Sequence, residues 1–422
     1  MENKMYLCID LKSFFASVEA VERGLDPMTE NLVVADPRRG KGAICLAITP
    51  AMKKLGVKNR CRIFEIPDDI DYVVALPRMK LYMEYSAKIY SIYLKYVSPE
   101  DVHIYSIDEC FIDITSYLKI YSMTAKEFAK TLINDVLAQT GISATCGIGT
   151  NLFLAKVALD VSAKNVPDKM GYLDLTEFKR TIWHHKPITD IWSIGRGIAN
   201  RLAEMNIYDL YGVAHASEER LYKEFGINAE LLIDHAKGIE PCTISDIHAY
   251  RSKSTSLSNG QILFEDYEID DAFLIIKEML DILSLELIDK GYVTNCISLT
   301  VGYADKFLPS TGGSFTFNEY TNSYKKLLGY FKDFYYKTVN YKAKVRKINL
   351  GLNNLKSEDH MVLDLMTDVK AEKREHKVRQ TVIDIKKKYG KNAILRAMDF
   401  QEKATARQRN TMIGGHNGGE DE

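Results

Sequence analysis

The stretch Tyr105-Ser-Ile-Asp-Glu-Cys-Phe-Ile-Asp113 is the part of the sequence that decides the fold. It places two adjacent acids, Asp108 and Glu109, between two strand-like segments, residues 103–106 and 110–114. Apolar segments of this kind favour a β-hairpin with the acids at or near its turn. An isolated Asp-Glu pair is most often a solvated turn, so the neighbouring sequence has to decide between the two interpretations.

A second acidic site lies upstream of this hairpin. Asp10 ends the apolar run 5–9 and opens a helix-like segment, 13–23, which Gly24 closes. If the two acidic strands are neighbours, three carboxylates converge, and they repel one another unless cations neutralise them. Carboxylate oxygens suit Mg²⁺, which takes the rest of its ligands from water and substrate phosphates. The pattern therefore favours two-metal phosphoryl or nucleotidyl transfer.

The composition is ordinary for a soluble globular protein. The 422 residues are 46% hydrophobic and 27% charged, and the net charge of −1 means that any basic surface must be local. The seven cysteines include no Cys-x-x-Cys pair, which favours a reduced, cytoplasmic setting over a disulfide or zinc framework. We expect neither a signal peptide nor a membrane span, because the longest apolar-rich segment, 272–287, carries charges at helical spacing.

The first half of the chain contains two kinds of pattern. Strand and helix signals alternate up to about residue 172, which predicts an α+β sheet with helices on one face. Residues 176–238 look all-helical, and Trp192-Ser-Ile-Gly195-Arg-Gly-Ile-Ala199-Asn-Arg-Leu202 has the spacing of a helix-hairpin-helix. Such a turn presents backbone N–H groups to a phosphate, although an ordinary helical hairpin shares the spacing.

The second half begins with a polar linker, 243–259, followed by another small α+β unit. From residue 355 the chain is charged and helix-prone. Between Lys370 and Arg409 it has 13 Lys and Arg against 5 Asp and Glu, which indicates a local basic patch. The Gly-rich, acidic end, 414–422, is expected to be disordered.

Several of these motifs resemble those of Y-family translesion DNA polymerases. Asp10-Leu-Lys-Ser-Phe-Phe15-Ala-Ser-Val-Glu19 is similar to the opening motif of that family, and residues 105–113 to its second acidic motif. Shorter matches, in order, are Leu55-Gly-Val-Lys58, Gly147-Ile-Gly-Thr-Asn151 and Leu154-Ala-Lys156. The tail, with Ala404-Thr-Ala-Arg-Gln-Arg-Asn410 and Ile413-Gly-Gly-His416, is similar to the UmuC/UvrX branch (ImpB/MucB/SamB type) of Gram-positive bacteria.

The resemblance implies the right-hand architecture of a polymerase. Its parts would be a ferredoxin-like palm (1–25 and 77–175), small fingers (26–76), a helical thumb (176–242), a little finger (243–354, with linker 243–259) and a basic C-terminal tail (355–422). It implies a template-directed DNA polymerase for error-prone translesion synthesis and DNA repair in the SOS response to damage. The alternatives are a catalytically weak DNA-binding accessory protein and a nucleotidyl cyclase, which also uses palm-like carboxylates.

The resemblance also implies roles for single residues. Asp10, Asp108 and Glu109 would be catalytic and, with the Leu11 carbonyl, would hold two Mg²⁺ ions, for which Mn²⁺ can substitute; Glu109 could instead be structural. Phe15 would be the steric gate that excludes a 2′-hydroxyl, while Phe14 beside it would line the nucleotide site or pack in the core. The remaining nucleotide-binding candidates are Thr49, Lys53 and Lys164, with Thr49 replacing a missing tyrosine hydroxyl.

The expected partners are primer-template DNA and deoxynucleoside triphosphates. The DNA-binding candidates are Gly195, Arg196, Gly197, Arg251, Lys253, Lys344, Arg346 and Lys347. Val362-Leu363-Asp364-Leu365-Met366 resembles a sliding-clamp-binding peptide, although it could equally be a core strand. The basic tail could serve a recombinase filament, an accessory subunit or DNA.

Overall fold

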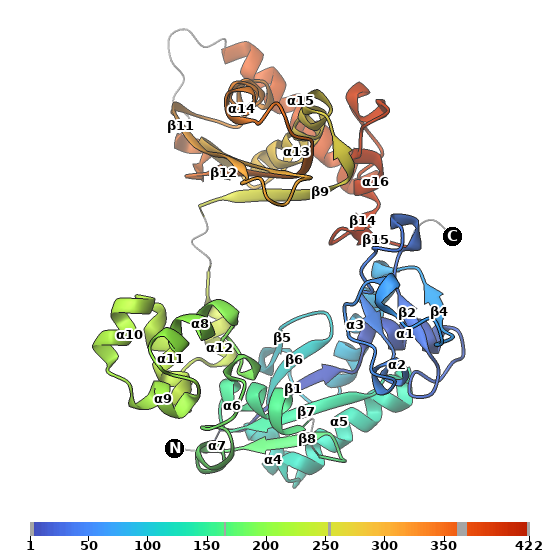
Figure 1. Ribbon diagram of the computed structural model, residues 1–422, viewed down its shortest axis with the longest axis vertical. Helices are drawn as coiled ribbons and strands as arrows, with labels where there is room; N and C mark the ends of the chain where they lie inside the picture. Colours follow the sequence, from blue (N-terminus) through green and yellow to red (C-terminus); the bar gives the residue numbers. More distant parts are fainter. Residues whose placement is uncertain (1–3, 164–165, 252–254, 361–368, 420–422) are drawn as a thin grey trace. The chain divides into compact units, whose positions relative to one another are not determined.

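A computed structural model describes residues 4–163, 166–251, 255–360 and 369–419. The chain divides into two compact units, one ending at Arg251 and the other beginning at Ser252. Each unit combines helices with its own β-sheet (Figure 1). The α+β class predicted from the sequence is confirmed.

The first unit is built around a main sheet of strand order β5-β6-β1-β7-β8. Its strands are β1 (Tyr6–Leu11), β5 (Val102–Ile104), β6 (Glu109–Asp113), β7 (Ala144–Gly149) and β8 (Met170–Leu173). β1 is central and runs antiparallel to both β6 and β7. The two acidic segments are therefore neighbours in the sheet.

Helices cover both faces of the main sheet, which corrects the expectation of helices on one face only. One face packs on α1 (Phe14–Glu22), α3 (Met79–Tyr93) and α5 (Ala125–Thr140). The other face packs on α6 (Leu152–Val157), a π-helical turn (Ala158–Ser162) and α12 (Ile244–Ala249). The physical reason lies in β1, where Tyr6, Leu7, Cys8 and Ile9 are all buried, so both faces need cover.

The Gly147-Ile-Gly149 motif explains how α6 packs so closely on the sheet. A Cβ at Gly147 would collide with the backbone of Ala155 and Leu159, and one at Gly149 with the backbone of Ala155. Only glycine allows this approach of helix and strand. The motif that contributed to the family resemblance is therefore a packing device that places α6 beside β1.

Two smaller parts complete the first unit. An insert between α1 and α3 has a sheet of order β3-β2-β4 and its own core around Cys45, Ile48 and Met52. Its elements are β2 (Leu32–Val34), β3 (Ala47–Ile48), β4 (Val73–Ala75) and α2 (Pro50–Lys54). A helical subdomain follows β8, with α7 (Leu175–Thr181), α8 (Arg196–Glu204), α9 (Leu210–His215), α10 (Glu218–Phe225) and α11 (Asn228–Ala236). Phe153, Leu154 and Val157 of α6 belong to its core, so α6 joins this subdomain to the main sheet.

The predicted linker, 243–259, is largely structured. Ile244 and Ile247, one helical turn apart in α12, pack against Tyr6, Phe111 and other residues of the main sheet. At its other end the segment becomes strand β9 (Leu257–Tyr267). The polar, serine-rich composition suggested a linker because two isoleucines in a short helix give too weak a periodic signal.

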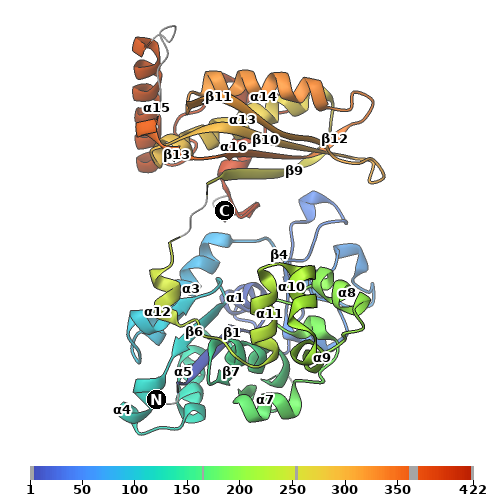
Figure 2. The same cartoon turned by 90° about the vertical axis from the view of Figure 1, so that its left-hand side faces the viewer.

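The second unit is a sheet covered on one face by two helices. The strand order is β11-β10-β12-β9, and the helices are α13 (Ile269–Asp289) and α14 (Tyr324–Thr338) (Figure 2). The other strands are β10 (Tyr292–Tyr303), β11 (Thr311–Thr321), β12 (Val345–Asn353) and the short β13 (Lys356–Ser357). Apolar residues such as Leu299, Leu327 and Leu350 form the core between sheet and helices.

The C-terminal region folds onto this second unit. Helix α15 (Val369–Tyr389) stands at one end of the sheet, and α16 (Ala406–Asn410) follows (Figure 2). Arg379 of α15 is buried and pairs with Asp281 of α13, while Thr405 donates to buried Glu278 of α13. The chain then forms a hairpin, β14 (Met412–Ile413) with β15 (His416–Asn417), where the sequence predicted disorder, because glycines 414 and 415 adopt the left-handed conformation of its turn.

Candidate active site

The three acidic residues predicted to act together meet on the main sheet. The antiparallel register places Asp10 directly opposite Glu109, so their side chains lie on the same face. Leu11 N–H donates to the Asp108 carbonyl at 2.9 Å, and Tyr105 N–H donates to the Glu109 carbonyl at 3.0 Å, which closes the hairpin. Ser106 Oγ donates to Asp108 Oδ1 at 2.7 Å and orients that carboxylate.

The electrostatics of this cluster show an excess of negative charge. Burial, followed by the negative charges of Asp108 and Glu109, raises the pKa of Asp10 to about 7. A carboxyl group behaves in this way when it is buried close to other carboxylates. The site therefore favours a cation.

Lys156 is a site residue to which the sequence assigned no role. Its Nζ lies 2.7 Å from Glu109 Oε1 and 3.1 Å from Asp160 Oδ2, and its side chain is only 9% exposed. Cys8 Sγ also donates to Glu109 Oε1, at 3.1 Å. Although burial lowers it, the hydrogen bond and charge of Glu109 raise the pKa of Lys156 overall, so the lysine stays charged. Its motif, Leu154-Ala-Lys156, was the available signal.

The donor chemistry fits divalent metal ions that complete their shell with substrate. Among the described residues, no group of three or more His, Cys, Asp or Glu side chains is already arranged to hold a metal ion. Mg²⁺ does not require such a group, because it keeps water and binds phosphate oxygens through one or two carboxylates. Asp10 and Asp108, with Glu109 beside them, supply hard oxygen donors at a place on the sheet that lacks positive charge.

The predicted steric gate rests on a rigid aromatic support. The rings of Phe15 and Tyr82 stack with centroids 4.5 Å apart and planes 17° apart. Tyr82 Oη donates to fully buried Glu19 at 2.8 Å, and Arg78 donates to both oxygens of that carboxylate. Phe14 is 2% exposed in the core of the main sheet, so the structure speaks against Phe14 as a nucleotide contact.

Four lysines lie near one another: Lys53 and Lys54 in α2 of the insert, Lys12 just after β1 and Lys169 just before β8. Burial, followed by the positive charges of Lys169, Lys54 and Lys53, lowers the pKa of Lys12. Like charges raise each other's energy unless an anion is present, so this group suits a phosphate chain. Lys53 was predicted for that role; Lys12 and Lys169 were not.

Thr49 does not fit its predicted role in nucleotide binding. The residue is fully buried, and its hydroxyl donates to the Glu30 carbonyl at 2.8 Å and accepts from Leu32 N–H at 3.1 Å. Because the single hydroxyl proton is already used inside the insert, Thr49 has none to offer a phosphate. The prediction from the sequence is corrected here.

The predicted helix-hairpin-helix forms an exposed helix start. Gly195 caps α8, Arg196 and Gly197 occupy its first turn, and all three are exposed. A Cβ at either glycine would meet nothing within 4 Å, so packing inside the protein does not require glycine there. The free N–H groups of this turn are therefore open to a close-approaching phosphate backbone.

The other cationic candidates have different surroundings. Lys347 is exposed on the sheet face that points away from α13 and α14, and its direct neighbours on the adjacent strands are Gly302 of β10 and Ile262 of β9. Lys344 and Arg346 are paired on the surface with Glu268 (2.9 Å) and Asp266 (3.1 Å). Arg251 donates to the His248 and Tyr250 carbonyls. Lys164, Lys253 and the peptide Val362–Met366 lie outside the described residues.

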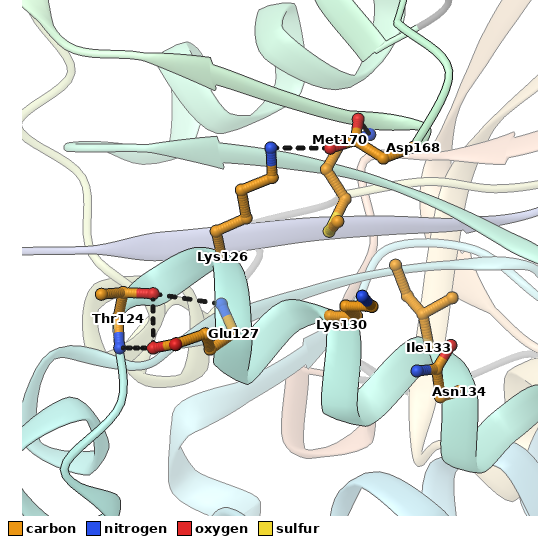
Figure 3. Close-up of a pocket in the computed structure, with 8 residues that line it drawn as sticks. All are labelled: Thr124, Lys126, Glu127, Lys130, Ile133, Asn134, Asp168 and Met170. Atoms are coloured by element: carbon orange, nitrogen blue, oxygen red, sulfur yellow. Dashed lines mark hydrogen bonds and ion pairs between the residues drawn. The ribbon is translucent and has the colours of Figure 1, made fainter.

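A separate pocket lies between α5 and the segment that leads into β8 (Figure 3). It has a volume of about 430 Å³ and includes an ion pair between Lys126 and Asp168 at 2.6 Å. None of the predicted site residues lines it. The carboxylate cluster, rather than this pocket, is the candidate active site.

The fold is that of Y-family DNA polymerases. A solved Y-family DNA polymerase chimera of Dbh and Dpo4 superposes with a TM-score of 0.64 over 85% of this chain and 100% of the chimera, at 20% identity. Residues 9–160 match the impB/mucB/samB family, and residues 254–365 match its C-terminal domain. The chain belongs to the impB/mucB/samB family.

Two relatives from Bacillus subtilis match almost the whole chain. The "Putative UV-damage repair protein UvrX" is 33% identical, over 98% of this chain and 97% of its own length. "DNA polymerase IV 2" is 30% identical, over 99% of both chains. A "DNA polymerase IV 2" from Halalkalibacterium halodurans is 28% identical over 98% of this chain. Within the described residues, no helix has the length and apolar character to span a membrane.

Proposed function

We propose that this protein is a template-directed DNA polymerase that acts in translesion synthesis and DNA repair. The observation that carries the proposal is the meeting of Asp10, Asp108 and Glu109 on adjacent strands of a Y-family polymerase fold. Full-length relatives named as DNA polymerase IV and as a UV-damage repair protein support the same conclusion. The main sheet would be the palm, the insert the fingers, the helical subdomain the thumb and the second unit the little finger.

In the proposed reaction, the carboxylates would hold two divalent metal ions, Mg²⁺ or Mn²⁺, with the Leu11 carbonyl as a further ligand. Bound there, such ions lower the pKa of a primer 3′-hydroxyl and neutralise charge on the α-phosphate and pyrophosphate. Glu109 is positioned by Lys156, and Ser106 orients Asp108. Lys12, Lys53 and Lys169 would attract the triphosphate. Phe15, supported by Tyr82, would lie under the sugar and select deoxynucleotides.

The proposed DNA contacts are with the phosphate backbone, because a polymerase must bind DNA of any sequence. The turn Gly195-Arg196-Gly197 offers N–H groups and a helix N-terminus. On the little-finger sheet, Ser298, Thr300 and Asn349 form a flat polar face with Lys347. Small side chains on this face allow a backbone to approach closely.

Primer extension by the purified chain tests this proposal. With Mg²⁺ and deoxynucleotides, the wild type should extend primers on intact and abasic templates, and Asp108→Ala should abolish extension while still binding DNA. Extension by Asp108→Ala at the wild-type rate would refute the assigned chemistry. A folded wild type that binds DNA without extending a primer would instead favour the alternative, a catalytically weak accessory protein.

We further propose a sliding clamp as a partner through Val362–Met366, on sequence grounds alone. Leu365→Ala should abolish stimulation of synthesis by the clamp while leaving unstimulated synthesis intact. Stimulation unchanged by this substitution would refute the assignment. A recombinase filament or an accessory subunit remains a second candidate partner for the basic C-terminal region, to be tested by adding each to the same reaction.

A further inference from the structure

The hairpin that carries the acidic pair touches the thumb through the ring of Trp192, which contacts both Tyr105 and Phe111. Trp192 Nε1 donates a hydrogen bond to Tyr105 Oη at 3.1 Å, and the two rings meet edge to face, 6.1 Å apart at 78°. Trp192 directly precedes the turn Ser193-Ile-Gly195, and Tyr105 lies three residues before Asp108. The contact therefore joins the proposed DNA-binding turn to the proposed catalytic hairpin.

Tyr105 is braced on the palm side. Its ring packs edge to face on buried Phe111 of β6, 5.7 Å away at 90°. Lys156 Nζ lies 6.0 Å from the centre of the Tyr105 ring while pairing with Glu109. A displacement of Tyr105 would thus shift the position of Glu109, both through the backbone of the hairpin and through Lys156.

Trp192 is braced equally well on the thumb side. Its ring lies nearly parallel to that of buried His235, 5.8 Å away, and His235 stacks on Phe153 of α6 at 4.0 Å. His235 Nε2 lies 3.0 Å from Glu240, which fixes the imidazole. The chain of rings therefore runs from the thumb into α6 and leaves Trp192 little freedom to turn away from Tyr105.

The residue after Trp192 has an unusual backbone that sets this direction. Ser193 has a φ of 71°, in the left-handed region that disfavours residues other than glycine. Its hydroxyl lies 3.5 Å from His235 Nδ1, so the side chain takes part in the same cluster. Ser193 thus contributes to holding Trp192 and the DNA-binding turn together.

We propose that the Tyr105–Trp192 contact is a positioning link, which transmits engagement of DNA by the thumb turn to the hairpin carrying Asp108 and Glu109. Neither residue touches the reacting atoms in this proposal, so both are positioning residues. The link rests on the proposed polymerase function. It predicts that the rate of nucleotide insertion on bound DNA depends on this contact, while the affinity for DNA does not.

Tyr105→Phe is the mildest test because it removes the acceptor hydroxyl and keeps the ring. Single-turnover insertion at saturating DNA and nucleotide should slow by about three- to tenfold, the effect of losing one hydrogen bond from the transition state. The dissociation constant for primer-template should change by less than about twofold. Tyr121→Phe is a matched control. Tyr121, the last residue of α4 (Thr115–Tyr121), is similarly exposed, and its hydroxyl donates to the Tyr96 carbonyl at 3.1 Å.

The double variant separates a link from two independent defects. Trp192→Phe should slow insertion to a similar degree, and Tyr105→Phe combined with Trp192→Phe should be no slower than either alone. Multiplicative losses would overturn the proposal, as would a saturated rate that stays at the wild-type value. A fall in DNA affinity with an unchanged saturated rate would also overturn it, because the contact would then only shape the thumb.

A spectroscopic measurement keeps the test independent of activity. The chain has two tryptophans, Trp183 and Trp192, so in a Trp183→Phe background the emission reports on Trp192 alone. Titration with Mg²⁺ should change this emission, and Tyr105→Phe should abolish the change; an equal change in both proteins would overturn the link. If the wild type itself inserts no nucleotides, the proposed function fails, and the fluorescence result still decides whether Trp192 and the acidic hairpin are coupled.

Discussion

Lys156 Nζ lies 2.7 Å from Glu109 Oε1, with the two side chains only 9% and 10% exposed. This pair joins α6, which packs into the thumb core, to the strand that carries the acidic pair. It supplies positive charge to a cluster in which the carboxylates otherwise repel one another. An ion pair so well buried is sensitive to the loss of either partner, because the remaining charge is left without compensation.

Lys156→Met is expected to destabilise the metal-free protein by about 3 kcal/mol, since it leaves Glu109 buried and unpaired. Urea unfolding in the presence of a chelator measures this loss. Lys156→Arg keeps the charge and serves as the control. Adding Glu109→Gln to Lys156→Met should recover much of the lost stability, and strictly additive losses would show that the pair does not act as a unit.

Phe15→Ala is expected to reduce discrimination against ribonucleotides by about 100-fold, because the ring no longer occupies the space of the 2′-hydroxyl. The ratio of kcat/KM for a deoxynucleotide and its ribonucleotide measures the effect. Tyr82→Phe is the matched control, because it keeps the supporting ring and removes only the hydrogen bond to Glu19. Unchanged discrimination in Phe15→Ala would show that Phe15 is not the steric gate.

Glu278→Gln is expected to reduce the pH dependence of stability in the second unit. Burial raises the pKa of Glu278, despite hydrogen bonds from Thr405 that lower it. For a raised pKa, the stabilising contribution is complete below the unfolded value and is lost as pH rises through the folded value. The wild type should therefore lose more stability than Glu278→Gln as the pH rises above the ordinary pKa of a glutamate, as measured by urea unfolding. Exposed Glu286→Gln on the same helix is the control, and equal losses in wild type and Glu278→Gln would contradict the prediction.

Lys347→Gln is expected to weaken DNA binding and to lower the slope of log affinity against log salt by about 0.9, the value for one phosphate contact. Fluorescence anisotropy at several salt concentrations measures both quantities. Lys344→Gln should change the slope less, because Lys344 is already paired with Glu268 at 2.9 Å. A slope that is unaffected by Lys347→Gln would exclude this residue from the DNA interface.

Local patterns in the sequence were sufficient for much of the fold. The alternation of strand and helix signals predicted the α+β character of the first unit, and the segment 272–287, with its charges at helical spacing, lies within α13. The family and the polymerase fold were predicted from ordered motifs and are confirmed by the comparisons. The meeting of Asp10 with Glu109 was predicted only on condition that their strands are neighbours, which the register confirms.

Predictions were less accurate where a side chain's role depends on partners far away in the sequence. Thr49 was assigned to a phosphate from its position next to Pro50, yet its hydroxyl is used by Glu30 and Leu32. The linker and the disordered tail were predicted from composition, and both segments are largely structured. Composition does not reveal that a few apolar side chains, or a buried ion pair such as Arg379 with Asp281, fix a segment in place. Such contacts join residues far apart in the chain and leave no local period.

The sequence by itself determined which chemistry is available to this protein: two acidic strand segments, an aromatic pair, a glycine-rich helical turn and scattered lysines. These features follow from residue type and short-range periodicity, which are properties of local segments. Only the tertiary structure decided that Lys156 faces Glu109, that Tyr82 supports Phe15 and that Trp192 reaches Tyr105. The reason is physical, because burial and packing across long chain separations select partners that no local pattern encodes.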